Sequence, residues 1–199
     1  MSLYSQLLAK RYKGRLDADA DQFIDFAAGG AKRMHELVQD LLAFTQVAEQ
    51  PAAIDAPVES GAVLESTLAG MRLALEGATV TYGELPAIAV HAQHVTQLFQ
   101  NLIGNAVKYR GDQPPVVHVS ARRDGACWEY SVKDNGMGID PLYHERIFGI
   151  FKRLHREAYP GTGIGLAICS RIVERYGGRI WVNSELGQGA EFLFTLPAA

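Results

Sequence analysis

Four polar side chains recur along one stretch of the chain at the spacing of an α-helix. Gln97, Asn101, Asn105 and Lys108 follow one another at three- or four-residue steps, so a helix would project all four from one face. An amide oxygen can bind Mg²⁺ while substrate phosphates and waters supply the other ligands, and a lysine can contact a phosphate. The stretch therefore predicts either a metal and phosphate site or a hydrogen-bonded polar stripe on an exposed helix.

A second cluster, Asp134-Asn135-Gly136-Met137-Gly138-Ile139, stands at the end of a predicted strand. A carboxylate at this place can accept a hydrogen bond from an exocyclic amine such as that of adenine. The two glycines let the backbone approach a flat ring closely and adopt a positive φ. By itself, such an aspartate-glycine sequence is more typical of an ordinary surface loop than of a binding site.

Glycines also open the last predicted helix, in Gly161-Thr162-Gly163-Ile164-Gly165-Leu166. The free amide N–H groups at a helix start, together with the helix dipole, favour an anion there. The segment lacks the glycine-lysine-serine/threonine ending of a Walker A loop, and no βαβ unit surrounds it. Just before it, Lys152 and Arg153 could face phosphates, while Phe148 and Phe151 could clamp a loop or simply be core.

The elements that would position these clusters follow from hydrophobic periodicity and turn residues. Alternating runs at 116–123 and 127–133, separated by Asp124-Gly125, predict a β-hairpin. We expect helices at about 61–76, 92–110 and 164–176, and further strands at about 78–83, 86–90, 179–184 and 190–196. These elements predict an α+β fold, a two-layer sandwich in which helices cover one face of a mixed, largely antiparallel sheet.

Residues 1–48 are expected to be helical, with short breaks at Gly14-Arg15 and around Asp17-Ala18-Asp19, where an aspartate can cap a second helix. From there apolar or small residues recur at coiled-coil spacing, namely Phe23, Ala27, Gly30, Met34, Leu37, Leu41, Phe44 and Ala48. Such a seam must be buried, either on the chain's own globular domain or, as we expect, in a bundle with a second chain. The two prolines at 51 and 57 predict a linker at 49–57.

The composition is that of a soluble globular protein. The formal net charge of −3 gives no general field to attract nucleic acid or an anionic membrane. No apolar run approaches the ~18 residues of a membrane span, and no signal peptide is visible. We expect a cytoplasmic location without direct membrane contact. Cys127 and Cys169 each lie in an apolar run and are expected to be buried, reduced thiols.

In their order along the chain, the polar helix, the Asp134 loop, the Phe148–Phe151 segment and the glycine-rich helix start resemble the N, G1, F and G2 boxes of the sensor histidine kinase ATP-binding domain. DNA gyrase, a heat-shock chaperone and mismatch-repair ATPases share this superfamily. Residues 178–197 resemble its closing hairpin. Residues 4–47 resemble the end of the first and all of the second helix of the dimerisation hairpin, of the type found beside phytochrome or PAS sensor modules.

The resemblance implies three parts: a partial dimerisation hairpin at 1–48, the linker at 49–57 and an ATP-binding catalytic domain at 58–199. It also implies roles for residues of the polar helix. Asn105 would bind Mg²⁺, with Asn101 beside it facing the phosphates. Lys108 would contact a phosphate, and Tyr109 would lie against the adenine.

For the second half of the site, the resemblance implies that Asp134 binds the adenine amine in a pocket shaped by Gly136 and Gly138. Residues 152–160 would form a lid over the nucleotide. The remaining expected ATP contacts come from this lid and the glycine-rich segment: Lys152, Arg153, Gly161, Thr162, Gly163, Gly165 and Leu166.

Two departures from the family pattern bear on the activity. Gln97 stands where the ATP-hydrolysing members carry a glutamate that activates water, and a glutamine cannot accept a proton. A kinase needs no such base, because its acceptor imidazole is already a nucleophile. The family's acceptor histidine lies on the first hairpin helix, whereas the first histidine here, His35, lies in the second, beside Glu36.

The sequence therefore predicts an ATP-dependent protein-histidine kinase whose acceptor histidine is not in this chain, so that the chain alone does not phosphorylate itself. The expected ligands are ATP and Mg²⁺. The expected partners are a second copy, through the N-terminal helices, and a response regulator receiver domain, whose aspartate takes the phosphoryl group. The alternatives are a nucleotide-driven ATPase and a dimerising scaffold that binds nucleotide without catalysis.

Overall fold

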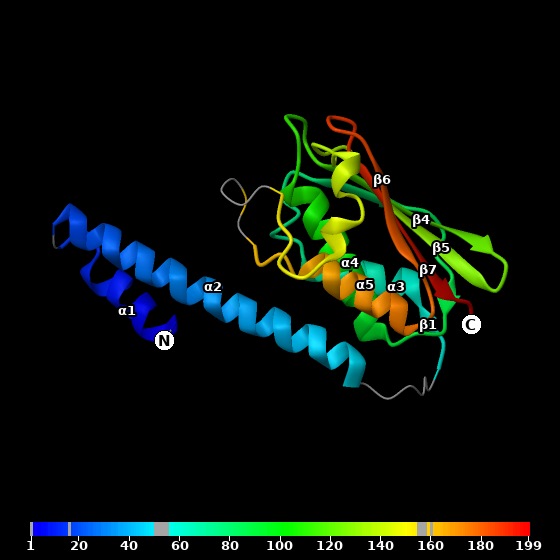
Figure 1. Cartoon of the computed structure of the whole chain (residues 1–199), viewed down its shortest axis with the longest axis horizontal. Coiled ribbons are helices and arrows are strands. Elements are labelled where there is room, and N and C mark those ends of the chain that lie inside the picture. Colours follow the sequence, from blue (N-terminus) through cyan, green and yellow to red (C-terminus); the bar gives the residue numbers. More distant parts are fainter. Residues whose placement is uncertain (1, 16, 50–55, 155–158, 160) are drawn as a thin grey trace. The chain divides into compact units, whose positions relative to one another are not determined.

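The computed structural model describes residues 2–15, 17–49, 56–154, 159 and 161–199 (Figure 1). The chain divides into two compact units, Met1–Ala43 and Phe44–Ala199. Most of the predicted linker at 49–57 and part of the predicted lid at 152–160 lie outside the described residues. Within the described part, no helix has both the length and the apolar character that crossing a membrane requires.

The first unit is a helical hairpin of α1 (Ser2–Tyr12) and most of α2 (Ala18–Glu49), which run antiparallel in Figure 1. Asp17 caps α2, because its Oδ1 accepts a hydrogen bond of 2.8 Å from the Ala20 N–H, as the sequence predicted. The Asp21 carboxylate accepts the Gly14 N–H at 2.8 Å. Lys13 forms an exposed ion pair of 2.8 Å with Asp25, and exposed pairs contribute little stability. The turn between α1 and α2 is therefore held mainly by the hydrogen bonds that Asp17 and Asp21 accept.

The second unit is the predicted two-layer sandwich. Its five-stranded sheet has the order β2-β4-β5-β7-β6, in which β2 and β4 are parallel and the other neighbours antiparallel. The strands are β2 (Thr79–Tyr82), β4 (Val116–Asp124), β5 (Cys127–Asp134), β6 (Ile180–Ser184) and β7 (Ala190–Pro197). A separate antiparallel pair joins β1 (Val58–Glu59) to β3 (Ala87–Ile88).

Three helices cover one face of this sheet in Figure 1: α3 (Ser60–Gly70), α4 (Ala92–Lys108) and α5 (Gly165–Arg175). Between β5 and α5 the chain forms two short 3₁₀ helices, η1 (Pro141–Tyr143) and η2 (Arg146–Phe148). The predicted helix at 61–76 was too long, because α3 ends at Gly70 and turns follow. Met71 and Leu75, whose apolar spacing suggested the longer helix, are partly buried, but they lie in turns in which the Ala74 and Leu75 N–H groups both donate to the Met71 carbonyl.

The core lies where alternate residues of the sheet meet α4 and α5. Tyr130 and Phe194 stack with ring centroids 5.1 Å apart, and Phe99 of α4 packs edge-on against Tyr130. The buried Tyr130 hydroxyl donates to Ser60 Oγ at 2.7 Å, and Ser60 donates to the Pro86 carbonyl at 2.6 Å. The polar groups of this aromatic core are thus satisfied, which buried hydroxyls require.

The two cysteines are free thiols, as expected, but only Cys169 is fully buried, whereas Cys127 is partly exposed. Cys127 opens β5 at the end of the β4–β5 hairpin, where it pairs with Asp124. Cys127 is the first residue of its strand and lies near the surface, whereas Cys169 lies in the middle of α5 and is covered by the core.

His94, near the start of α4, is a titratable group inside this unit. Its side chain is 2% exposed, Nδ1 lies 2.7 Å from the Tyr176 hydroxyl, and Nε2 has no hydrogen-bond partner among the described residues. Burial, and then the neighbouring charges of His91 and Arg175, lower the pKa of His94 from 6.5 to about 4. The folded protein therefore holds this imidazole neutral.

Stability is expected to decline as the pH falls from about 6.5 towards 4, because the unfolded chain then binds a proton at His94 that the folded chain excludes. At about pH 4 and below, the free energy of unfolding would be lower than at neutral pH by about 3 kcal/mol. Urea unfolding of His94→Gln should show a flatter pH dependence than wild type. His118→Gln, at an exposed histidine of β4, is the control and should behave as wild type. An unchanged pH dependence in His94→Gln would contradict this assignment.

Candidate functional site

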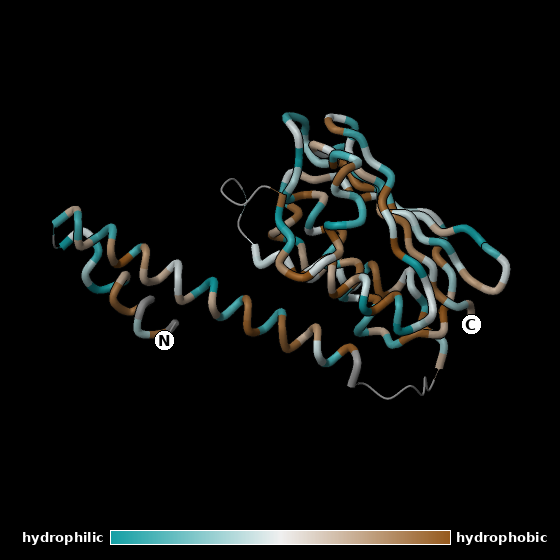
Figure 2. Tube along the Cα trace, viewed as in Figure 1, coloured by the Kyte–Doolittle hydropathy of each residue, from teal (hydrophilic) through white to brown (hydrophobic). Residues whose placement is uncertain are grey.

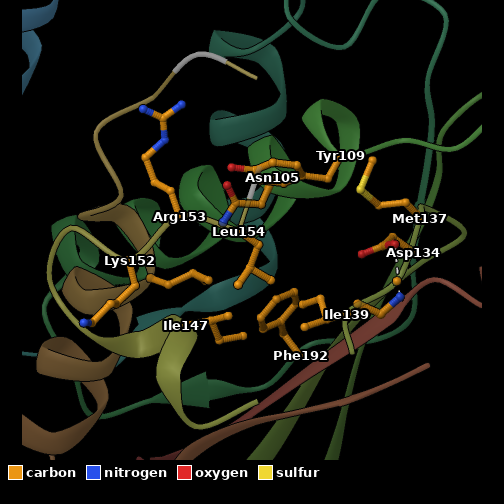
Figure 3. Close-up of a pocket in the computed structure, with 13 residues that line it drawn as sticks. Asn105, Tyr109, Asp134, Met137, Ile139, Ile147, Lys152, Arg153, Leu154 and Phe192 are labelled. Atoms are coloured by element: carbon orange, nitrogen blue, oxygen red, sulfur yellow. Dashed lines mark hydrogen bonds between the residues drawn. The ribbon is translucent and has the colours of Figure 1, made fainter. Parts of the chain in front are cut away.

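A cavity of about 90 Å³, partly open to solvent, lies among α4, the loop after β5 and β7 (Figure 3). Its lining is mainly apolar: Met137, Gly138, Ile139, Ile147, Leu154, Leu166, Ala190 and Phe192. Five residues with polar groups join them: Asn105, Tyr109, Asp134, Lys152 and Arg153. An apolar cavity with a few converging polar groups is typical of a small-molecule binding site.

Asp134, the last residue of β5, lines the cavity with a carboxylate of which one oxygen is hydrogen-bonded to the protein (Figure 3). Its Oδ1 accepts the Gly136 N–H at 2.8 Å and the Ala190 N–H at 3.1 Å. Its Oδ2 accepts no hydrogen bond from a described residue, so it is available to a donor on a ligand. Burial raises the pKa of this carboxyl, and the two N–H donors partly offset that effect.

The wall around Asp134 depends on two glycines with left-handed backbone. Gly138 has a φ of 73°, and a Cβ there would collide with the Glu185 carbonyl oxygen. Gly189 has a φ of 75°, and a Cβ there would collide with the carbonyl oxygen of Asp134 itself. Both positions need glycine, because the loop after β5 and the β6–β7 turn come into backbone contact.

The end of α4 supplies the opposite wall. The side-chain amide of Asn105 lines the cavity and makes no hydrogen bond with a described residue. The Tyr109 carbonyl accepts the Met137 N–H at 3.0 Å, which ties α4 to the loop after β5. Lys108 Nζ lies 4.7 Å from the centre of the Tyr109 ring and against Gly161, where a Cβ would displace it. Lys108 therefore reaches the start of the glycine-rich segment rather than the cavity itself.

Lys152 and Arg153 lie on the side of the cavity away from Asp134 in Figure 3. The backbone from Phe151 to Arg153 packs against Gly163, whose φ is 75° and whose Cβ would approach all three of these residues. Phe151 itself has a φ of 61°, a rare conformation for a bulky residue. The glycine-rich segment thus fixes the backbone of these two cationic residues beside the cavity. Their charged ends point outward in Figure 3, and Arg153 donates a hydrogen bond to the Tyr159 carbonyl. A ligand with an amine at one end and an anion at the other would match this separation of charges.

Asn101, unlike Asn105, is not among the residues that line the cavity. Its side chain lies near the Cys169 thiol of α5 and so close to Gly165 that a Cβ added there would be 2.8 Å from Asn101 Oδ1. Burial raises the pKa of Cys169 to about 12, so this thiol stays protonated. Asn101 therefore joins α4 to the start of α5, one turn of helix away from Asn105.

The predicted site residues thus fall into two groups. Asn105, Tyr109, Asp134, Gly138, Lys152, Arg153 and Leu166 line one cavity. The others are not part of its lining: Gln97, Asn101, Lys108, Gly136, Gly161, Thr162, Gly163 and Gly165.

Sequence reasoning missed six lining residues: Met137, Ile139, Ile147, Leu154, Ala190 and Phe192. Met137 and Ile139 could have been found from their place beside the two glycines of the Asp134 loop. Ala190 and Phe192 carried no such signal, because apolar residues at alternate positions of a strand are typical of core.

Comparisons with known proteins agree with this geometry. Residues 90–199 match the family model of the histidine kinase-, DNA gyrase B- and HSP90-like ATPases. Cyanobacterial phytochrome A of Nostoc sp. (strain PCC 7120) is 47% identical over 197 residues, which are 98% of this chain and 26% of that protein. Phytochrome-like protein Cph1 of Synechocystis sp. (strain PCC 6803) is 42% identical over 200 residues, which are 99% of this chain and 27% of that protein.

Among solved structures, full-length ShkA in complex with AMPPNP has a TM-score of 0.73 at 28% identity, covering 100% of this chain and 45% of that one. The chain spans about a quarter of the length of the two curated relatives.

Proposed function

The chain belongs to the family of histidine kinase-, DNA gyrase B- and HSP90-like ATPases and is the ATP-binding domain of a sensor histidine kinase, and from this we propose that its cavity binds Mg-ATP. The γ-phosphoryl group would be transferred to a histidine. The observation that carries the proposal is the arrangement of charge in the cavity. The available Oδ2 of Asp134 lies at one side, Lys152 and Arg153 lie at the other, and apolar side chains lie between.

The Asp134 side of the cavity suits adenine. The flat ring would lie among Met137, Ile139 and Phe192, and its exocyclic amine would donate to Asp134 Oδ2. Guanine carries a carbonyl oxygen at that position, which would face the carboxylate with like partial charge. A preference for ATP over GTP follows from this single contact.

The other side suits the triphosphate. Lys152 and Arg153 would bind phosphate oxygens, and Lys108 would act at the glycine-rich segment that it touches. The Asn105 amide oxygen, which no described residue engages, fits a Mg²⁺ ligand. Since the described residues hold no cluster of three or more histidine, cysteine or acidic side chains, phosphates and waters would complete the metal's coordination. Bound Mg²⁺ would neutralise charge that develops on the transferring group.

Transfer to an imidazole, rather than hydrolysis, is supported by the side chains present. Asp134 is the one carboxylate among the described residues that line the cavity, and it lies at the adenine side. Gln97 cannot take a proton from water. Protein groups would therefore bind and orient the nucleotide, and an acceptor histidine would supply the nucleophile. Relay to a response regulator aspartate completes the proposal.

The proposal is tested by following both fates of the γ-phosphoryl group. The chain is incubated with labelled Mg-ATP, alone and with an added sensor-kinase dimerisation hairpin that carries its acceptor histidine. We expect acid-labile, alkali-stable label on the added hairpin and little free phosphate. Rapid phosphate release without protein label would favour the ATPase alternative. Nucleotide binding, measured by calorimetry, with neither protein label nor phosphate release would favour the scaffold. Label on the chain itself that disappears in His35→Gln would make His35 the acceptor.

We propose in addition that α2 pairs with a second copy of the chain. Large apolar side chains along it are exposed, among them Phe23 at 68%, Met34 at 54% and Leu41 at 47%, and hydrophobic residues recur along α2 in Figure 2. A row of this kind at coiled-coil spacing is costly in water and is normally covered by other helices.

Met34→Glu is therefore expected to weaken self-association by about tenfold or more, because it places a charge in the apolar seam. Gln39→Glu, an exposed polar position of the same helix, adds the same charge and should leave association unchanged. Light scattering over a dilution series measures both. A monomeric wild type at high concentration, or equal effects of the two substitutions, would count against pairing through this seam.

A further inference from the structure

The hydroxyl of Ser184 connects two segments of the cavity wall. Ser184 is the last residue of β6, and its Oγ donates a hydrogen bond of 2.6 Å to the Gly189 carbonyl. The same oxygen accepts the Ile139 N–H at 2.8 Å. One partner belongs to the β6–β7 turn and the other to the loop after β5, so the hydroxyl bridges them.

We propose that Ser184 is a positioning residue for nucleotide binding, whose hydroxyl holds the Asp134 carboxylate and Ile139 in place at the adenine side of the cavity. This inference rests on the proposed function for its ligand, and on the hydrogen bonds above for its geometry. Ser184 does not line the cavity and touches no reacting atom, so it acts through other residues.

The connection to Asp134 runs through the β6–β7 turn. Ser184 fixes the Gly189 carbonyl, and the next residue, Ala190, donates its N–H to Asp134 Oδ1. Gly189 also lies against the main-chain carbonyl of Asp134, where a side chain would not fit. A shift of Gly189 would therefore move both the donor and the backbone that hold this carboxylate.

The connection to Ile139 is direct, because its N–H is bound to Ser184 and its side chain lines the cavity. A second link between the same segments runs from the Gly187 N–H to the Met137 carbonyl at 2.7 Å. The Gly187–Met137 hydrogen bond joins two backbone groups, so no side chain can be removed to test it. The Ala190–Asp134 hydrogen bond uses the carboxylate that is proposed to bind the ligand. Among the described hydrogen bonds between these segments, Ser184 offers the side chain that can be removed without touching a ligand contact.

Loss of the Ser184 hydroxyl has a consequence for the charge of Asp134. The N–H groups of Gly136 and Ala190 lower the pKa of Asp134 against the larger effect of burial. Lys152 and Arg153 line the same cavity and Lys133 precedes Asp134, but no described ion pair joins any of these three to Asp134. Glu191, which follows Ala190, is a like charge and accepts a hydrogen bond from Ser131. If Ala190 moves away, the pKa of Asp134 rises. Nucleotide binding needs the ionised carboxylate, so in an acid titration the variant would lose binding at a higher pH than the wild type.

The test compares Ser184→Ala with Ser184→Thr, which keeps a hydroxyl, and with Ser131→Ala. Ser131 is a matched control, because its hydroxyl also donates a side-chain hydrogen bond, to Glu191 at 2.7 Å, without contacting either segment of the wall. We expect Ser184→Ala to weaken Mg-ATP binding about five- to tenfold by calorimetry. Ser184→Thr should recover most of this loss, and Ser131→Ala should bind as wild type.

Two readouts without nucleotide separate positioning from a general loss of stability. Amide hydrogen exchange at Ile139 and Ala190 should accelerate in Ser184→Ala but not in Ser131→Ala. A carboxyl NMR titration should place the Asp134 midpoint at a higher pH in Ser184→Ala alone. Wild-type exchange and an unchanged midpoint in Ser184→Ala would overturn the inference. If the wild type failed to bind Mg-ATP, the proposed function would fall, while these two measurements would still decide the role of Ser184.

Discussion

Asp134→Asn is expected to weaken Mg-ATP binding by about ten- to a hundredfold, the loss of one charge-assisted hydrogen bond of about 1.5–3 kcal/mol. The available Oδ2 is the atom that would accept the adenine amine, and an asparagine can place a donor there instead. The fold should survive, because an amide oxygen can still accept the Gly136 and Ala190 N–H groups that Oδ1 accepts now.

Calorimetric titration with Mg-ATP and Mg-GTP measures this effect. Asp124→Asn is the control for the loss of one negative charge, since Asp124 is exposed in the β4–β5 turn and an Asn-Gly pair suits that turn equally well. Undiminished ATP binding in Asp134→Asn, or a preference of the wild type for GTP, would show that this carboxylate does not recognise adenine.

Gly138→Ala is expected to abolish measurable nucleotide binding and to destabilise the fold by about 3 kcal/mol or more. Gly138 combines a φ of 73° with a backbone collision, since its Cβ would overlap the Glu185 carbonyl oxygen. A carbonyl cannot move aside as a flexible side chain can. The β6–β7 turn would have to separate from the loop after β5, which would remove Ala190 from Asp134.

Gly187→Ala separates the two causes of this loss. Gly187 lies in the adjacent turn with a φ of 79°, but nothing lies within 4 Å of a Cβ built there. It should cost only the left-handed backbone penalty, about 1–2 kcal/mol, and should still bind ATP. Chemical denaturation and calorimetry of both variants test the distinction. Equal stability losses, or ATP binding retained in Gly138→Ala, would mean that the contact with Glu185 can relax.

Several features of the chain were predictable from sequence because they depend on residues near one another in it. Asp124-Gly125 between two alternating runs predicted the β4–β5 hairpin, and Asp17 predicted the start of α2. The family resemblance of the polar helix and the glycine clusters pointed to a nucleotide site, and seven of its expected residues do line one cavity. Turn, cap and motif signals are short-range, so no knowledge of the packing was needed to recognise them.

Tertiary packing decided what those residues do. Asn101 and Asn105 share one helix face by spacing, yet Asn105 reaches the cavity while Asn101 packs against Gly165 and Cys169, because α5 crosses α4 at that turn. Periodicity assigns a side to a helix but not the neighbour that each turn meets. Ala190 and Ser184 lie about fifty residues from Asp134 in sequence, and only the antiparallel pairing of β5 with β7 and β7 with β6 brings them to it. Contacts made through the sheet carry no local signal, which is why the half of the adenine pocket built by the β6–β7 turn became visible only in the folded chain.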